Sequence, residues 1–274
     1  MLPASSAMPF SNALLPPFEP ALRVLVADDN ELNQLVVCRA LEDWNVEVAL
    51  ADNGRQAVEL ATSQAFDVIL MDVQMPEMDG YEATRQLRSH SPLHQLPIIG
   101  LTASASAADQ AQALAAGMNA TLAKPFDPTL LHASLAHYTR RATPASDSAA
   151  ASADAHAGSP AAPDWSILEE LAAGNEGFIA QIIGTFLHQT PPLYQELVQA
   201  SAHAEPATRA RIAHKLKGQV VYFGVQPLQQ LLEQLERPAT AISPAAAQPL
   251  VEAVGQQLDD LYPQLEARLH PHTF

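Results

Sequence analysis

Short apolar runs alternate with amphipathic stretches over the first half of the chain. Between residues 21 and 140, five runs rich in Val, Ile, Leu and Ala are each followed by a stretch with helical spacing. This alternation predicts β-α units that form a parallel sheet with helices on both faces. We expect strands at 22–27, 46–50, 67–71, 97–101 and 119–123. We expect helices at about 31–43, 54–65, 80–90, 106–116 and 127–139.

The second half shows helical spacing only. Strand patterns vanish after Asp164, and apolar stripes predict helices at roughly 165–173, 175–189, 191–203, 206–223, 225–236 and 246–267. The last of these carries its stripe at spacings of four, four, three and four, at Leu250, Val254, Leu258, Leu261 and Leu265. An antiparallel helix bundle is the natural way to bury several such stripes.

Two segments have no apolar periodicity and divide the chain. Residues 1–20 are rich in Pro, Ala and Ser and predict a disordered tail. Residues 141–163 are an Ala-, Ser- and Pro-containing linker, which as a flexible coil would span roughly 26 Å. We therefore expect a five-stranded, doubly wound α/β domain at 21–140 and an all-α four-helix bundle at 164–270.

Composition and charge narrow the possible classes of function. The formal charge is −16, and we find no basic patch of the kind that binds nucleic acid. The single cysteine, Cys38, excludes an intramolecular disulfide and suits a reducing compartment. The first basic residue is Arg23, so a signal peptide is not expected, and no apolar run is long enough for membrane insertion. We expect a soluble, cytoplasmic protein.

Polar residues with complementary chemistry follow four of the predicted strands. Asp28 and Asp29 follow the first strand, Asp72 the third, Thr102 the fourth and Lys124 the fifth. Each alone is a weak signal, because Asp often caps a helix and Lys-Pro often marks a turn. In a doubly wound sheet, however, these strand ends lie along one edge, so the side chains converge. Three clustered carboxylates suit Mg²⁺, which prefers oxygen ligands.

Together these residues fit phosphoryl chemistry. A carboxylate can act as a nucleophile and form an acyl phosphate, and Asp72 lies at the end of an apolar strand. The metal and the Lys124 ammonium would neutralise the phosphoryl group, while the Thr102 hydroxyl would donate a hydrogen bond to it.

The same segments closely resemble two-component receiver (response regulator) domains, over about residues 21–140. Val-Ala-Asp-Asp-Asn-Glu-Leu-Asn, the Asp72 segment, Leu-Thr-Ala and Ala-Lys-Pro-Phe match in order and spacing, most like receivers of hybrid histidine kinases. The resemblance implies a flavodoxin-like fold. It implies that Asp72 is the phosphoacceptor, and that the metal is held by Asp28, Asp29, Asp72 and the backbone carbonyl of Gln74. Thr102 and Lys124 would sense the phosphoryl group.

Two departures from phosphoaspartate families matter. Thr121 stands where many receivers have a Tyr or Phe that turns inward on phosphorylation. Phosphohydrolases of the haloacid dehalogenase type, an alternative class with an Asp nucleophile, typically have a second acid two residues later, where this chain has Gln74. The phosphohydrolase interpretation is therefore the weakest.

A single histidine is the centre of the second domain. Ile212, Leu216, Val220 and Phe223 recur at four, four and three and predict the buried face of a helix, with His214 on the opposite, solvent side. Arg211, Lys217 and Gly218 share its face, and the glycine would let another protein approach the imidazole. Four of the six Lys and Arg residues of this domain lie between Arg209 and Lys217, which predicts a cationic collar around the histidine.

This region resembles histidine phosphotransfer (Hpt) domains over about residues 165–267. Ala-His-Lys-Leu-Lys-Gly, a glycine ten residues after the histidine, and Leu-Glu-Gln-Leu-Glu follow that pattern. The resemblance implies that His214 is phosphorylated and that Lys217 and Gly218 serve the phosphoryl group and docking. The family often has small residues after the glycine, whereas this chain has Gln219, Val220 and Val221.

The two resemblances together predict a phosphorelay protein, similar to the C-terminal modules of hybrid histidine kinases. Asp72 would receive phosphate from an upstream histidine kinase, and His214 would carry it to or from the receiver of a separate response regulator. We find no kinase-like nucleotide-binding motif, so we expect a transfer intermediate whose receiver can dephosphorylate itself rather than a kinase. The alternative is a phosphate-insensitive docking module of a two-component system, which Thr121 favours.

Overall fold

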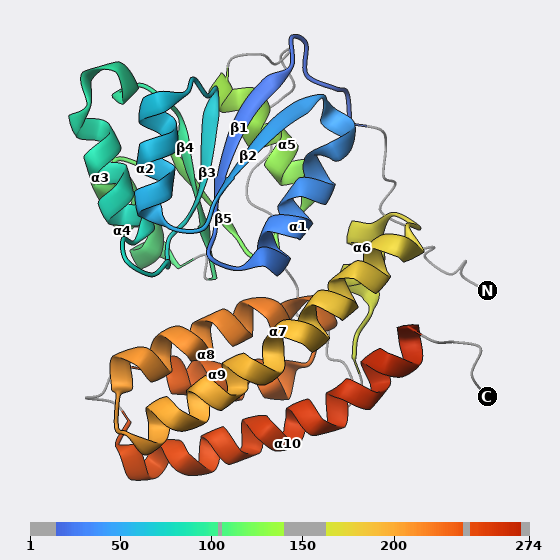
Figure 1. Cartoon of the computed structure of the whole chain (residues 1–274). Coiled ribbons are helices and arrows are strands. Elements are labelled where there is room, and N and C mark those ends of the chain that lie inside the picture. The colour runs from blue at the N-terminus through green and yellow to red at the C-terminus, as the bar shows by residue number, and fades with distance from the viewer. Residues whose placement is uncertain (1–14, 104–105, 140–162, 238–241, 270–274) are drawn as a thin grey trace, which may run out of the picture.

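The computed structural model describes residues 15–103, 106–139, 163–237 and 242–269. These residues form an α/β unit followed by a helical unit, and the two pack against each other (Figure 1). The predicted linker at 141–163 lies outside the described residues except for Pro163. None of the described helices is long and apolar enough to cross a membrane.

A five-stranded parallel sheet forms the core of the first domain. The strand order is β2-β1-β3-β4-β5. The strands are β1 (Leu22–Ala27), β2 (Val46–Ala51), β3 (Val68–Asp72), β4 (Ile98–Thr102) and β5 (Ala120–Ala123). The order changes direction between β1 and β3, and at such a switch point the carboxyl ends of the strands open a crevice where ligands bind.

Helices cover both faces of this sheet, as predicted. Residues of β1 alternate between the two sides, with Val24 and Val26 in one apolar cluster and Leu25 in the other. The helices α1 (Glu31–Leu41) and α5 (Pro128–Thr139) pack on the first side. On the second side lie α2 (Gly54–Ser63), α3 (Gly80–Ser89) and α4 (Ala107–Ala116). Buried strands such as β3 are apolar on both faces, here from Val68 to Met71, because neither face meets water.

The loop after β3 is fixed by two residues. Asp79 caps α3, because its Oδ1 accepts a hydrogen bond from the Glu82 amide at 2.7 Å. Gly80 begins the helix directly against the end of the strand, where a Cβ atom would lie 2.1 Å from the carbonyl oxygen of Asp72. The sequence Asp-Gly therefore sets the close approach of α3 to the end of β3.

The second domain is a bundle of four main helices. These are α7 (Glu176–Ala202), α8 (Pro206–Val220), α9 (Gln226–Glu236) and α10 (Pro244–Leu269), with the short α6 (Ser166–Ala172) packed on α7. The predicted apolar face of α8 is confirmed, since Ile212, Leu216 and Val220 are buried. The apolar cluster of the bundle continues into the α1 and α5 side of the first domain, so the two units share a buried boundary.

One helix replaces the two predicted at 175–189 and 191–203. Because Pro191 and Pro192 remove backbone donors, they suggested a break. In the structure α7 runs through both prolines, with buried Phe186 before them and buried Leu197 after them. Burial of apolar side chains on both sides of the prolines outweighs the lost backbone hydrogen bonds, which is why local signals gave the wrong answer.

The predicted disordered tail is wrong for its last six residues. Phe18 is buried, and its amide donates to the Trp44 carbonyl at 2.9 Å. The Asn45 side chain donates to the Phe18 carbonyl at 2.9 Å, and the Phe18 ring stacks on His132. Burial of this ring and these hydrogen bonds hold the segment against the domain. Residues 1–14 lie outside the described residues.

Candidate functional site

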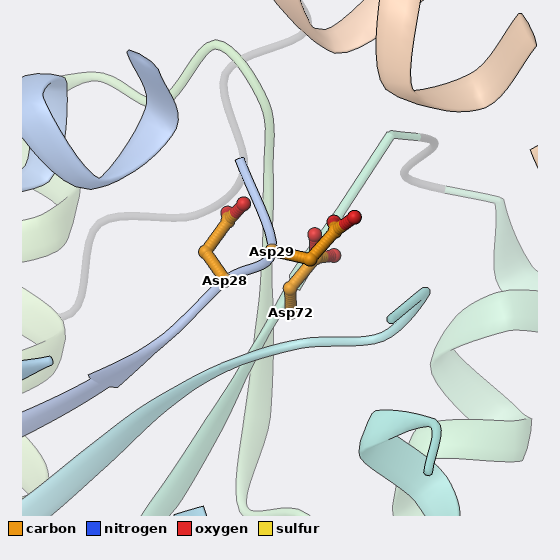
Figure 2. Close-up of side chains that lie close together, drawn as sticks. All are labelled: Asp28, Asp29 and Asp72. Carbon is orange, nitrogen blue, oxygen red and sulfur yellow. The ribbon is translucent and has the colours of Figure 1, made fainter. Parts of the chain in front are cut away.

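Three aspartates meet at the switch point of the sheet. Asp28 and Asp29 follow β1, and Asp72 ends β3, so the neighbouring strands deliver them to the same edge. One carboxylate oxygen from each residue lies within 4.8 Å of those of the other two, and Figure 2 shows the three side chains gathered together. Asp28 and Asp72 are both buried. The predicted convergence of these three carboxylates is therefore observed.

Lys124 joins two of these carboxylates. Its Nζ lies 2.6 Å from Asp28 Oδ2 and 2.8 Å from Asp72 Oδ2. The backbone holds it there, because the Lys124 amide donates to the Thr102 carbonyl at 2.7 Å where β4 ends. Burial would lower the pKa of Lys124, but the two carboxylates outweigh burial and raise that pKa, so the side chain is an ammonium ion.

Ionisation of Asp72 is unfavourable in this site. The pKa of its carboxyl group is raised to about 6: burial is the largest cause, Lys124 opposes the shift, and Asp28 adds to it. The three carboxylates outnumber the two lysines that pair with them, Lys124 and Lys215, and leave an excess of negative charge in a poorly hydrated site. The all-oxygen donor set and this excess charge both fit a hard divalent cation such as Mg²⁺.

The other predicted residues of this pocket lie around Asp72. Thr102 is buried and lines a cavity of about 440 Å³ together with Asp72 and His214. The Gln74 amide donates to Asp72 Oδ1 at 3.3 Å, so the backbone of Gln74 follows the acidic group while its side chain is exposed. Thr121 is half-buried in β5.

His214 projects from α8 towards this pocket. The histidine and Asp72 both line a cavity of about 460 Å³, together with Lys124, Lys217 and Gly218. The prediction that His214 faces solvent is wrong, because the first domain covers that side of the helix. The helical stripe correctly identified the face opposite the bundle core, but not what packs against it.

Glu236 at the end of α9 orients the histidine. His214 Nδ1 lies 2.7 Å from Glu236 Oε1, and the Lys217 ammonium pairs with the other carboxylate oxygen. Burial would raise the pKa of Glu236, but hydrogen bonds from His214 and Lys217 outweigh burial and lower that pKa. A carboxylate can only accept, so Nδ1 carries a proton; when the ring is neutral, the lone pair is therefore on Nε2.

Comparisons with known proteins agree with these two halves. The family model described as "Response regulator receiver domain" matches residues 24–136, and the model described as "Hpt domain" matches residues 181–268. The chain is a receiver domain followed by an Hpt domain. The parallel sheet with its aspartate cluster is the receiver, and the helix bundle that carries His214 is the Hpt domain.

Curated relatives extend across both domains. Signal transduction histidine-protein kinase BarA of Shigella flexneri is 33% identical over 236 residues, which cover 82% of this chain and 25% of that protein. Sensor protein GacS of Pseudomonas syringae pv. syringae is 33% identical over 221 residues, covering 79% of this chain and 24% of that protein. The chain thus spans about a quarter of the length of these relatives.

Among solved structures, a similar one is the receiver domain of sensor histidine kinase PA1611 from Pseudomonas aeruginosa PAO1, described with a magnesium ion in its active site cleft. It is 40% identical, covers 44% of this chain and 98% of that chain, and gives a TM-score of 0.42.

The predicted cationic collar around His214 is only partly present. Arg209 is buried, and its side chain donates to the carbonyls of Leu235 and Arg237. It therefore holds the end of α9, which carries Glu236, rather than facing the receiver. Lys215 crosses to the receiver instead, where its Nζ donates to the Asp29 carbonyl oxygen at 2.6 Å and lies 3.2 Å from Asp29 Oδ2.

Gly218 allows the receiver to come close. The nearest atoms to a Cβ placed there would be the side-chain amide nitrogens of Asn30 and Asn33, both at 3.6 Å. A larger side chain would collide with these two residues of the receiver. This placement accounts for a glycine inside α8, despite its cost of about 1 kcal/mol relative to alanine.

Sequence reasoning missed three residues of this site. Glu236 closes the Leu-Glu-Gln-Leu-Glu segment, and Asn33 closes the segment that begins Val-Ala-Asp-Asp; both segments were recognised, but these residues received no role. Tyr222 follows the atypical residues after Gly218. The available signal was that each residue lies in or beside a recognised motif. Spacing along the chain could not show which distant residue each of them contacts.

Proposed function

We propose that this chain is a phosphorelay intermediate in which Asp72 and His214 exchange a phosphoryl group. The observation that carries this proposal is the shared cavity, which both side chains line within one chain. Each side chain also has its own supporting charges, Lys124 beside Asp72 and Lys217 beside His214. A protein that only docks to a partner would not need a charged side chain beside each of these two residues.

Phosphate enters at the receiver. An Asp72 carboxylate oxygen attacks the phosphorus of a phosphohistidine on an upstream histidine kinase, and the nitrogen–phosphorus bond breaks with its electron pair returning to that histidine. Lys124 compensates charge on the transferred group, and the Thr102 hydroxyl donates a hydrogen bond to it. Asp28, Asp29, Asp72 and the carbonyl of Gln74 would hold Mg²⁺, which supplies further positive charge when bound.

The second step moves the group to the Hpt domain. The free Nε2 of His214 attacks the phosphorus, and the bond to Asp72 breaks and restores the carboxylate. Glu236 keeps the proton on Nδ1 and stabilises the cationic ring that forms, while Lys217 is placed to face the phosphoryl oxygens. Gly218 leaves room for the approaching receiver.

The chemistry can run in both directions. From His214 the group passes to the receiver of a separate response regulator, or it returns to Asp72, where water hydrolyses the acyl phosphate. We assign no ATP-dependent step to the residues described. The single cysteine fits a reducing compartment, and we place the protein in the cytoplasm.

Peptide mapping by mass spectrometry tests this proposal. The purified chain is incubated with Mg²⁺ and acetyl phosphate and compared with the variants Asp72→Asn and His214→Gln. We expect wild type to carry phosphate on both residues, Asp72→Asn to lose both signals, and His214→Gln to retain phosphate on Asp72. Phosphate that reaches His214 in Asp72→Asn would contradict the order of transfer.

The alternative function is a docking module that does not respond to phosphate. Thr121 favours it, because a small side chain in β5 replaces the family's aromatic switch. The same experiment separates the two functions. If neither residue is labelled by acetyl phosphate or by a panel of histidine kinases, docking becomes the better account.

A further inference from the structure

The boundary between the two domains contains a buried tyrosine. Tyr222 lies in the 3-10 turn Val221–Phe223 that follows α8, and none of its surface is exposed. Its hydroxyl donates a hydrogen bond to Asn33 Oδ1 of α1 at 3.1 Å, across the boundary between the Hpt domain and the receiver. A buried hydroxyl without a partner is costly, so this bond favours a receiver that offers an acceptor at this point.

Asn33 connects the tyrosine to the phosphoacceptor site. Its Nδ2 donates to Asp28 Oδ1 at 3.0 Å. The other oxygen of Asp28 accepts from Lys124, which also pairs with Asp72. A continuous series of hydrogen bonds therefore runs from Tyr222 in one domain to Asp72 in the other.

The order of donors and acceptors fixes the orientation of Asn33. The Asp28 carboxylate can only accept, so the amide nitrogen of Asn33 faces it and the amide oxygen faces Tyr222. A tyrosine hydroxyl can donate to that oxygen. The receiver thus presents an acceptor whose position is set by one of its own site carboxylates.

Further contacts cross the boundary. Asn30 Nδ2 donates to the Lys215 carbonyl at 3.3 Å, and the Gln189 side chain bonds to Glu31. Gln219 is buried and bonds both Thr190 and Gln189 at 3.0 Å. Gln219, one of the residues that depart from the family pattern after Gly218, is therefore linked to the receiver through Gln189.

We propose that Tyr222 is a positioning residue that selects this chain's own receiver as the transfer partner of His214. The inference rests on the proposed function, and it adds which receiver is preferred and through which bond. A receiver with an apolar side chain in place of Asn33 would leave the tyrosine hydroxyl buried and unpaired. Discrimination by a buried polar group of this kind is strong because the wrong partner leaves it unsatisfied.

The test compares full-length wild type with Tyr222→Phe in a single-turnover assay. After Asp72 is phosphorylated by acetyl phosphate, transfer to His214 is followed at low protein concentration. We expect a transfer rate about tenfold lower in Tyr222→Phe, with labelling of Asp72 unchanged. The matched control is Tyr194→Phe, which loses a hydroxyl that donates to the Val251 carbonyl within the bundle. Equal rates in wild type and Tyr222→Phe, or equal losses in both variants, would overturn the proposal.

A second pair of variants tests the partner. Asn33→Leu should slow transfer to wild-type Tyr222, and adding Tyr222→Phe should recover part of that loss, since two apolar groups no longer bury an unpaired hydroxyl. A double variant slower than Asn33→Leu alone would count against selection by this bond.

Hydrogen–deuterium exchange provides a measurement that needs no phosphate. In Tyr222→Phe, amides of α1 should exchange several-fold faster than in wild type and in Tyr194→Phe, because docking on α1 is weaker. Unchanged exchange overturns the inference even if phosphate is transferred. Faster exchange supports it even if His214 is never labelled, so its outcome is separate from that of the proposed function.

Discussion

Asp72 is a buried carboxyl group beside two other carboxylates. Its position at the end of an apolar strand suits a nucleophile, because a partly desolvated carboxylate with a lysine beside it is held in one orientation. The same position opposes ionisation, and burial together with Asp28 raises its pKa. In the proposed function, Asp72 would therefore serve phosphoryl transfer at the expense of stability.

Asp72→Asn should stabilise the metal-free protein at neutral pH. A carboxyl group whose folded pKa is raised contributes stability below its ordinary value of 3.8, and that contribution is lost as pH rises through about 6. The asparagine side chain of the variant does not ionise and so contributes no such pH dependence. We therefore expect Asp72→Asn and wild type to have equal free energies of unfolding below about pH 4. At pH 7.5 the variant should be more stable by about 1–3 kcal/mol. Urea unfolding in the presence of EDTA measures both values.

The exposed Asp259 provides the control. Asp259→Asn should leave the free energy of unfolding within about 0.5 kcal/mol of wild type at both pH values. An Asp72→Asn variant that is less stable than wild type at pH 7.5 would show that the pairing with Lys124 outweighs burial. Added Mg²⁺ should raise the melting temperature of wild type more than that of Asp72→Asn.

At the scale of elements, junctions between strands and helices place the site. Each predicted site residue of the receiver lies at or just beyond the end of a strand, so the register of the sheet sets the distances between them. The junction between β3 and α3 is the tightest constraint on Asp72, because Gly80 packs on its carbonyl group.

Gly80→Ala should destabilise the receiver and impair labelling of Asp72. The new Cβ would lie 2.1 Å from the Asp72 carbonyl oxygen, so the backbone of β3 or α3 must shift. We expect a loss of about 2–4 kcal/mol in the free energy of unfolding and slower labelling by acetyl phosphate.

Gly184→Ala is the matched control in α7. Gly184 is exposed, and no atom lies within 4 Å of a Cβ placed there. This variant should be more stable by about 0.5–1 kcal/mol and should label normally, because alanine favours the helix. Normal labelling in Gly80→Ala would mean that the loop after β3 adapts without moving Asp72.

At the scale of the whole molecule, docking of the two domains and metal binding share a residue. Lys215 of the Hpt domain pairs with Asp29 of the receiver, and Asp29 belongs to the acidic cluster that would hold Mg²⁺. An ammonium ion beside this cluster disfavours a second cation there. The docked Hpt domain should therefore weaken metal binding at the receiver.

Lys215→Gln should bind Mg²⁺ roughly two- to fivefold more tightly than wild type, by isothermal titration calorimetry at low salt, because one positive charge beside Asp29 is removed. The gain should shrink at high salt. Arg85→Gln removes an exposed charge of the same sign on α3 and should leave the affinity unchanged. Equal affinities of Lys215→Gln and wild type would show that Lys215 leaves Asp29 when the metal binds.

Local patterns were informative wherever one element determined the outcome. The five strands were predicted to within one residue at each end, and the aspartate cluster followed from strand ends that must meet at one edge. The buried stripe of α8 likewise followed from spacing alone. These features depend on periodicity and topology, which are present in the sequence.

Features that depend on packing between distant residues could not be predicted. Continuity of α7 through Pro191 and Pro192 depends on burial by neighbouring helices. The ordered position of Phe18 depends on its ring packing against His132, which itself contacts Trp44. In each case local propensity pointed the other way, and long-range burial of apolar surface was larger.

The sequence by itself determined the two fold classes and the histidine with its neighbouring lysine and glycine. It also determined the convergence of Asp28, Asp29, Asp72, Thr102 and Lys124. These features follow from strand ends and helical spacing, which are local consequences of the order of residues. Only the tertiary structure decided what faces His214. The Glu236 contact, the cover provided by the receiver and the bond between Tyr222 and Asn33 join residues that lie far apart along the chain. Their pairing is set by how whole surfaces fit when apolar area is buried, and no spacing within one element carries that information.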